Sequence, residues 1–130
     1  MEDNSSLIGK IKVSRMPYYD NKERKINYKA RPILILKCEK EFGMSDLTVV
    51  PVSSISMRQN IDISFDLEIT KKVYPFLNLR KETCYIRCGR IMTISKKDLA
   101  VKTVSDLRSS YPELWQRIIH KVGEYVSDIN

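Results

Sequence analysis

An arginine stands directly before a proline and an aliphatic run in the segment Arg31-Pro32-Ile33-Leu34-Ile35-Leu36. Such a run predicts a buried strand, in which a proline is tolerated at the first position. A second apolar run, residues 47–54, ends in two hydroxyls, Ser53 and Ser54. A guanidinium and a hydroxyl at neighbouring strand ends can together bind a phosphate. The alternatives are an ion pair of Arg31 at its strand start and a hydrogen-bonded, purely structural hydroxyl at Ser53.

Basic residues gather in two segments of this chain, whose formal net charge is +7. Residues 10–31 hold eight basic residues against two acidic ones, a local net charge of +6. Residues 80–97 hold six basic residues and one acidic residue. Two such segments favour a polyanionic partner, most simply a nucleic acid. A solvated basic surface, or a patch for an acidic protein, is the alternative.

Three tyrosines, Tyr18, Tyr19 and Tyr28, lie within the first basic segment. Aromatic rings among cations can stack on the splayed bases of single-stranded nucleic acid. The same rings can instead pack their segment onto the body of the domain, and the sequence leaves both interpretations open. The candidate RNA contacts are Tyr18, Tyr19, Lys22, Arg24, Lys25, Tyr28 and Lys29, together with Ser54, Arg87 and Arg90.

The elements that would position these residues are mostly strands. Apolar runs and apolar–polar alternation predict strands at 7–13, 32–38, 47–53, 61–69, 83–87 and 90–94. Residues 14–30 are polar and carry Pro17, so they are predicted to form a long basic loop. Gly89 predicts a bulge or sharp bend between the last two strands.

The period of the apolar residues changes near the C-terminus. Leu114, Ile118 and Val122 follow one another at helical spacing, which predicts a C-terminal amphipathic helix at 109–128. A serine at 109 or 110 is the expected N-cap, and Pro112 suits the first turn. The fold class is therefore mainly β, a small, strongly bent barrel with short helices, formed as a single domain over residues 1–130.

Bulk properties exclude several classes of protein. No apolar run approaches the roughly 18 residues of a transmembrane helix, and no signal peptide is visible, so a cytoplasmic location is expected. Three cysteines are an odd number for a disulfide framework, and reduced, packed thiols are the better interpretation. The chain has one histidine, His120, far from the cysteines in sequence. We therefore expect no metal site and no cofactor.

Five segments in order resemble the MazF/PemK family of toxins from bacterial toxin–antitoxin pairs. These are Arg-Pro with its aliphatic strand (31–36), Val-Val-Pro-Val-Ser-Ser (49–54), the alternating strand (61–69), Cys-Tyr-Ile-Arg-Cys-Gly-Arg-Ile-Met-Thr-Ile (84–94) and the terminal helix. The resemblance implies a homodimer of SH3-like barrels with five to seven strands. It also implies a metal-independent endoribonuclease, an mRNA interferase, which an acidic antitoxin neutralises by inserting its tail into the basic groove.

The resemblance assigns catalysis to Arg31 and to Ser53, which stands where the family usually has threonine. The 2′-hydroxyl of RNA is the nucleophile, so the expected products carry a 2′,3′-cyclic phosphate and a 5′-hydroxyl. Arg31 would stabilise the charge that develops on the phosphate, and Ser53 would orient it. The sequence identifies no general base, although Asp20 and Glu23 are candidates. A catalytically weak or inactive relative that only binds RNA or a protein is the alternative.

Overall fold

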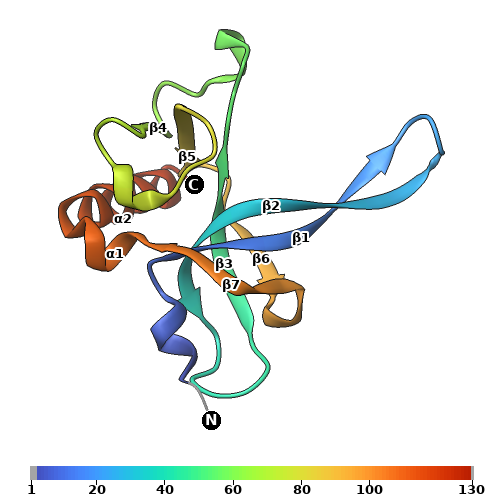
Figure 1. Cartoon of the computed structure of the whole chain (residues 1–130), viewed down its shortest axis with the longest axis horizontal. Coiled ribbons are helices and arrows are strands. Elements are labelled where there is room, and N and C mark those ends of the chain that lie inside the picture. The colour runs from blue at the N-terminus through green and yellow to red at the C-terminus, as the bar shows by residue number, and fades with distance from the viewer. Residues whose placement is uncertain (1–2, 130) are drawn as a thin grey trace.

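The computed structural model describes residues 3–129, and within them the chain forms a mainly β fold, as predicted (Figure 1). The strands are β1 (Lys10–Asp20), β2 (Lys25–Cys38), β3 (Asp46–Ser53), β4 (Asp66–Thr70), β5 (Thr83–Arg87), β6 (Met92–Ser95) and β7 (Leu99–Asp106). The helices are α1 (Leu107–Ser110) and α2 (Pro112–Ser127), with 3₁₀ turns η1 (Asn4–Leu7), η2 (Arg58–Asn60), η3 (Pro75–Leu77) and η4 (Lys96–Asp98).

All strand pairs are antiparallel and form one curled sheet in the order β4-β5-β3-β2-β1-β7, with β6 paired to β3. The aliphatic runs of β2 and β3 are buried on both faces of this sheet. Leu34 and Val50 belong to one hydrophobic cluster, whereas Ile33 and Val49 belong to a second cluster on the other face. Alternate residues of a strand face opposite sides of the sheet. A strand that contributes to a hydrophobic cluster on each side therefore needs a continuous apolar run.

Strand β3 changes partners along its length. Its first half pairs with β6 from Asp46↔Ser95 to Val49↔Met92, and its other edge pairs with β2 as far as Ile33↔Pro51. Its last two residues pair with β5 instead, as Val52↔Ile86 and Ser53↔Tyr85. The sheet therefore divides at the end of β3, where β2 continues toward Arg31 and β3 follows β5.

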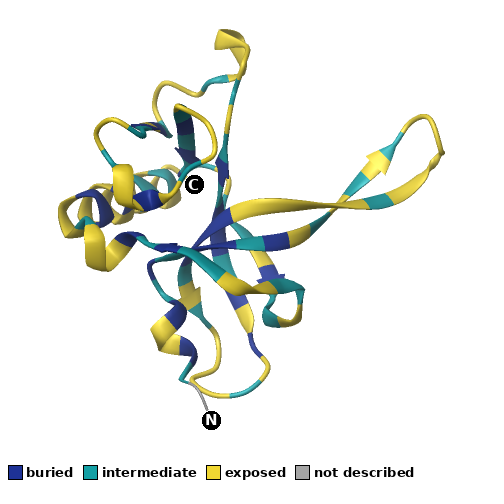
Figure 2. Cartoon of the chain, viewed as in Figure 1, coloured by how far each residue is buried: buried dark blue, intermediate teal, exposed yellow. Residues whose placement is uncertain are grey.

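The predicted loop at 14–30 is wrong, because these residues form the arms of a long β-hairpin. The ladder runs without interruption from Ile11↔Leu34 to Asp20↔Lys25 and carries the hairpin well away from the body of the molecule (Figure 1). Most of its residues are exposed (Figure 2), so it has no apolar alternation for a sequence pattern to detect. Pro17 is tolerated because, within the described chain, β1 beyond Ser14 pairs with β2 alone.

Cross-strand pairs between cations and aromatic rings stabilise this hairpin. The Arg15 guanidinium lies 4.0 Å from the centroid of the Tyr28 ring, and the Lys29 ammonium lies 4.5 Å from that of Tyr18. At the tip, the Asp20 carboxylate accepts hydrogen bonds from the backbone N–H groups of Lys22 and Glu23. Diagonal cation–π pairs and an Asp-capped turn replace the packing that a buried strand would have.

The predicted strand at 61–69 is only half present. β4 begins at Asp66, whereas residues 62–65 form a turn. The Asp62 carboxylate accepts hydrogen bonds from the N–H groups of Ser64 and Phe65, which is the Asx-turn chemistry that competes with a strand. β7 was not predicted at all, since its exposed alanine, valine and lysine at 100–102 interrupt any apolar alternation.

The C-terminal helix is confirmed over Pro112–Ser127, with Pro112 in its first turn as predicted. The predicted caps are wrong: Ser109 and Ser110 belong to α1, which Asp106 caps through the Ser109 N–H, and α2 starts after Tyr111 without a side-chain cap. α2 covers one end of the core with Leu114, Trp115 and Ile118. No helix within residues 3–129 is both long and apolar enough to cross a membrane.

Candidate functional site

A cavity of about 620 Å³ lies where β2 and β3 separate. Arg31, Ser53 and Ser54, which the sequence predicted to lie together, all line it. The other lining residues are Ile11 and Val13 of β1, Ala30 and Pro32 of β2, Val52 of β3, Asn78, Leu79, Arg80 and Lys81 of the segment after η3, Cys84 of β5 and Val104 of β7. The structure therefore brings residues from five strands and from the segments after β3 and η3 to a single hollow.

The register of the sheet explains why Arg31 and Ser53 meet here. The last β2–β3 pair is Ile33↔Pro51. Continuing that antiparallel register by two residues would set Arg31 opposite Ser53, on the same face of the sheet. The β2–β3 ladder stops before that point, while β3 pairs with β5 at its other edge, so the two residues border an opening rather than a hydrogen-bonded pair.

Three basic residues of the cavity have side chains that are not neutralised. Arg31, Arg80 and Lys81 are exposed, and among the residues that the structure describes none of them has a side-chain hydrogen bond or ion pair. The interpretation of Arg31 as a structural ion pair is therefore not supported. No aspartate, glutamate or histidine from residues 3–129 lines this cavity. Its electrostatic character is positive, as a phosphate requires.

Arg80 and Lys81 were noticed in the sequence as part of the second basic segment but were not assigned to the site. A local turn brings them there. Asn78 adopts a left-handed conformation (φ 57°) at the end of η3, and its side-chain amide donates to the Val104 carbonyl at 3.0 Å. An Asn-Leu-Arg-Lys stretch after a proline turn is the sequence signal, because asparagine tolerates that conformation.

Arg87, a predicted RNA contact, has a different environment. Its Nε and one terminal nitrogen donate to the two carboxylate oxygens of Asp66, each at 3.1 Å, and the same terminal nitrogen also donates to the Asn60 carbonyl at 2.9 Å. The Asp66 side chain is 2% exposed and that of Arg87 is 12% exposed. This bidentate pair joins β4 to β5, so Arg87 is not one of the free cations of the cavity. Arg90 is exposed beyond the Gly89 turn and does not line the cavity.

The seven predicted contacts in residues 14–30 lie along the hairpin rather than in the cavity. Lys22 and Arg24 are in the exposed turn, and Lys25 begins β2. Tyr19, Tyr28 and Lys29 are exposed on the arms, and Tyr18 is half-buried. Alternation places Tyr19 and Tyr28 on the face of Ala30 and Pro32, whereas Tyr18 and Lys29 are on the face of Arg31; residues of both faces line the cavity.

The two candidate bases at the hairpin tip are too far from Arg31 in the same chain. Asp20 is six residues along β1 from Ser14, the partner of Arg31, which is roughly 20 Å of strand. The Glu23 N–H bond, followed by those of Lys22 and Asn27, lowers the pKa of Asp20, although slight burial opposes this. Hydrogen bonds from Asn27 and Lys25 lower the pKa of Glu23. Both carboxylates accept hydrogen bonds that stabilise the hairpin turn.

The single histidine, His120, and the buried cysteines Cys84 and Cys88 offer no reactive group to the cavity. His120 is exposed on α2, 2.8 Å from the Glu124 carboxylate. Cys84 lines the cavity, but burial raises the pKa of its thiol, and burial raises the pKa of Cys88 to about 11. Both thiols are therefore protonated at neutral pH and act as core groups. Residues 3–129 contain no cluster of three histidine, cysteine, aspartate or glutamate side chains suited to a metal.

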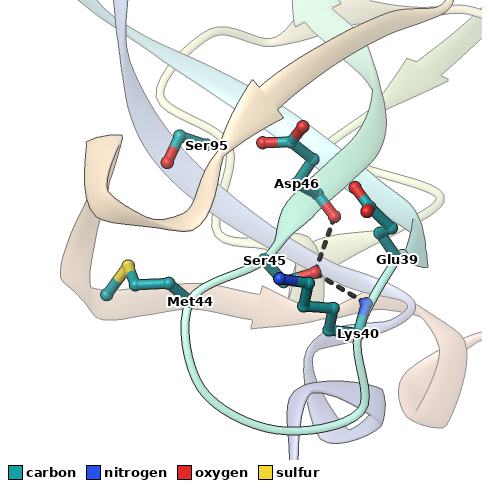
Figure 3. Close-up of a pocket in the computed structure, with 6 residues that line it drawn as sticks. All are labelled: Glu39, Lys40, Met44, Ser45, Asp46 and Ser95. Atoms are coloured by element: carbon teal, nitrogen blue, oxygen red, sulfur yellow. Dashed lines mark hydrogen bonds between the residues drawn. The ribbon is translucent and has the colours of Figure 1, made fainter.

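A second, smaller hollow of about 230 Å³ lies at the β2–β3 connection (Figure 3). Glu39, Lys40, Met44, Ser45, Asp46 and Ser95 line it. The Ser45 hydroxyl accepts from the Lys40 N–H at 2.9 Å and donates to the Asp46 carbonyl at 2.8 Å. These bonds close the connection, and the lining carries charges of both signs. This hollow therefore lacks the uniformly positive lining of the larger cavity.

Comparison with known proteins adds no assignment: no protein-family model matches the chain, and no curated protein matches it significantly in sequence.

Proposed function

We propose that this protein is a metal-independent endoribonuclease that cleaves single-stranded RNA, including mRNA, to 2′,3′-cyclic phosphate and 5′-hydroxyl ends. The observation that carries the proposal is the cavity at the β2–β3 division. It combines three unpaired cations, Arg31, Arg80 and Lys81, with the hydroxyls of Ser53 and Ser54. A phosphodiester is the ligand that such a set of donors suits.

The chemistry follows from RNA itself, which carries a 2′-hydroxyl beside every phosphodiester. Arg31 binds the non-bridging oxygens and stabilises the negative charge that grows on them in the transition state. Its guanidinium stays protonated, so its role is electrostatic rather than acidic. Ser53 donates a hydrogen bond that fixes the phosphate for in-line attack. Arg80 and Lys81 hold the neighbouring backbone.

The proposal includes the biological setting that the family resemblance implies. The protein acts as a cytoplasmic homodimeric toxin, and an acidic, partly disordered antitoxin segment binds its basic hairpin. Charge complementarity with the hairpin would speed that association. Light scattering tests the dimer. Co-expression with the product of a neighbouring open reading frame tests neutralisation of growth arrest, and a lack of growth arrest on expression alone would contradict the toxin role.

A second candidate function is an RNA-binding module without catalysis. It is favoured by one observation, since no carboxylate or imidazole of the described chain lines the cavity. RNA bound without cleavage, with an affinity that falls steeply with salt, would establish this alternative.

The decisive experiment incubates purified protein with a long single-stranded RNA in EDTA and maps the product ends. Wild type is expected to cleave, and Arg31→Ala to lose about 10²–10³ in rate. Arg31→Lys keeps the charge but loses the bidentate donors, so most of the loss should remain. Arg117→Ala on α2 removes an arginine that does not line the cavity and is the matched control. Equal rates for Arg31→Ala and wild type would contradict the mechanism.

A further inference from the structure

The phenylalanine of η3 has its side chain on the surface, although it belongs to an ordered turn. Phe76 is 70% exposed, whereas the next residue, Leu77, is fully buried in the core. A single exposed aromatic residue needs no explanation by itself, so the question is how its ring is held.

Tyr111, at the junction of α1 and α2, holds the Phe76 ring in place. The two rings are stacked, with centroids 6.2 Å apart and an angle of 25° between their planes. The Tyr111 hydroxyl accepts a hydrogen bond from the Phe76 backbone N–H at 2.9 Å. The Tyr74 ring packs edge-on against Tyr111, with centroids 5.0 Å apart. We call these three rings the aromatic platform. Phe76 is its outermost ring, supported by a fixed tyrosine and open to solvent.

The aromatic platform adjoins the cavity. Asn78, two residues after Phe76, lines the cavity together with Arg80 and Lys81. Two residues of chain span at most about 7 Å, and the tight turn of η3 shortens that distance. η3 lies beside α1 and β7 (Figure 1), and β7 contributes Val104 to the cavity wall. The hydrogen bond from the Asn78 amide to the Val104 carbonyl fixes this junction.

The charges near the platform favour RNA as the ligand. Residues 70–82 hold one acidic residue, Glu82, and four basic residues, Lys71, Lys72, Arg80 and Lys81. Arg80 and Lys81 have no side-chain hydrogen bond or ion pair within the described chain. An apolar protein surface docked on Phe76 would bury cations without giving them a partner. Single-stranded RNA instead offers a phosphate for the cations and a base for the ring.

We propose that Phe76, supported by Tyr111, is a stacking site for one base of single-stranded RNA, the base attached to the backbone that Arg80 and Lys81 hold. This inference rests on the proposed function for its ligand. It adds a base contact to a cavity whose cations and hydroxyls engage the phosphate backbone. Every base has a π-face, so the site accepts any base. It disfavours double-stranded RNA, in which the bases are already stacked and paired.

The first test measures binding by fluorescence anisotropy to an RNA carrying 2′-O-methyl groups, which cannot be cleaved. Phe76→Ala is expected to bind about 5- to 150-fold more weakly than wild type, and Phe76→Leu nearly as weakly, because leucine has no ring on which a base can stack. Phe76→Trp keeps an aromatic face and should bind within about twofold of wild type or more tightly. All three variants keep the backbone N–H that Tyr111 accepts, and Phe76 is largely exposed, so thermal unfolding should show them folded.

Val73→Ala is the matched control. It removes another exposed apolar side chain from the same segment, one that is 62% exposed and carries no ring. It should change the affinity for this RNA by less than about twofold, since it removes no stacking.

The second test locates the base. Wild type and Phe76→Leu are compared on copies of the 2′-O-methyl RNA that each lack one base, at successive positions around the mapped cleavage site. At one position the missing base should weaken wild type by about 5- to 150-fold and Phe76→Leu by less than about twofold, because the variant has already lost that contact.

Equal affinities of wild type, Phe76→Ala and Phe76→Trp would overturn the inference, while cleavage by wild type would leave the proposed function standing. Losses that are the same in both proteins at every missing base would overturn it too. A changed oligomeric state of Phe76→Ala in light scattering, with unchanged RNA affinity, would assign the ring to a protein interface and overturn it. If wild type binds RNA without cleaving it, the proposed function fails, and a loss in Phe76→Ala that Phe76→Trp restores still upholds the inference. If wild type binds no RNA, both fail.

Discussion

Arg31 owes its position to its neighbours in the chain. The part of β2 that is packed on both faces begins at Ile33, two residues after Arg31, so Arg31 is fixed to a rigid element while its side chain stays exposed. A guanidinium held in this way needs little reorganisation when charge develops on a phosphate. Ser53 is likewise fixed to a rigid element, because it is the last residue of β3 and directly follows the buried Val52.

The residue-scale prediction concerns Ser53. Threonine at this position keeps the hydroxyl and adds a methyl that restricts its χ1 rotamers. If three staggered wells become one, the productive rotamer is populated up to about threefold more, and Ser53→Thr should raise the cleavage rate by a similar factor. Ser53→Ala should lower it by about 10²-fold. Single-turnover cleavage at saturating protein measures both effects, and equal rates for alanine, serine and threonine would remove Ser53 from the mechanism.

The sequence predicts part of this site for a physical reason. Arg31 and Ser53 adjoin strands whose apolar runs are readable, so their meeting needs only that β2 and β3 pair. Arg80 depends on the left-handed turn at Asn78, and the opening depends on the register at which β2 and β3 stop pairing. Register is decided by the packed tertiary fold, and a single sequence does not reveal it.

At the scale of elements, the hairpin of β1 and β2 presents two different faces. One face carries Tyr19, Ile26 and Tyr28 and continues into Ala30 and Pro32, whereas the other carries Tyr18 and Lys29 and continues into Arg31. The first face carries the more exposed rings, Tyr19 and Tyr28, so we expect RNA to follow it on leaving the cavity. Arg15 lies over the Tyr28 ring and keeps it in place.

This difference yields a prediction for matched variants. Tyr28→Ala should weaken binding of 2′-O-methyl RNA by about 5- to 150-fold, because one stacked base is worth ~1–3 kcal/mol. Tyr18→Ala removes the same ring from the opposite face and should change affinity by less than about twofold. Fluorescence anisotropy at one fixed salt concentration measures both. Equal losses would show that RNA does not follow the predicted face.

Elements with a buried face were predictable, and those without one were not. β2, β3, β5 and α2 follow apolar patterns that their cores require. The outer hairpin is held by cation–π pairs and an Asp turn, which leave no periodic signal. The segment 61–69 shows that a regular alternation does not ensure a strand. Its first half forms a turn, because the Asp62 side chain accepts hydrogen bonds from nearby backbone N–H groups.

At the scale of the whole molecule, the net charge of +7 has a measurable consequence for RNA binding. Each phosphate neutralised on a single strand contributes about 0.7 to the slope of log affinity against log salt. If Arg80 and Lys81 each contact a phosphate, the double variant Arg80→Ala/Lys81→Ala should lower that slope by about 1.4. A salt series of binding measurements with 2′-O-methyl RNA tests this value. An unchanged slope would mean that the backbone passes elsewhere.

Strand β3 is the element that both halves of the sheet hold in common, since it pairs with β2, β6 and β5. Neither half can open while this strand stays hydrogen-bonded to the other. The amide protons of β3 should therefore exchange with solvent last, only when the entire chain unfolds, and unfolding should proceed as one cooperative transition. The opening that admits a phosphate is bordered by the least yielding part of the molecule, so substrate would enter a preformed site.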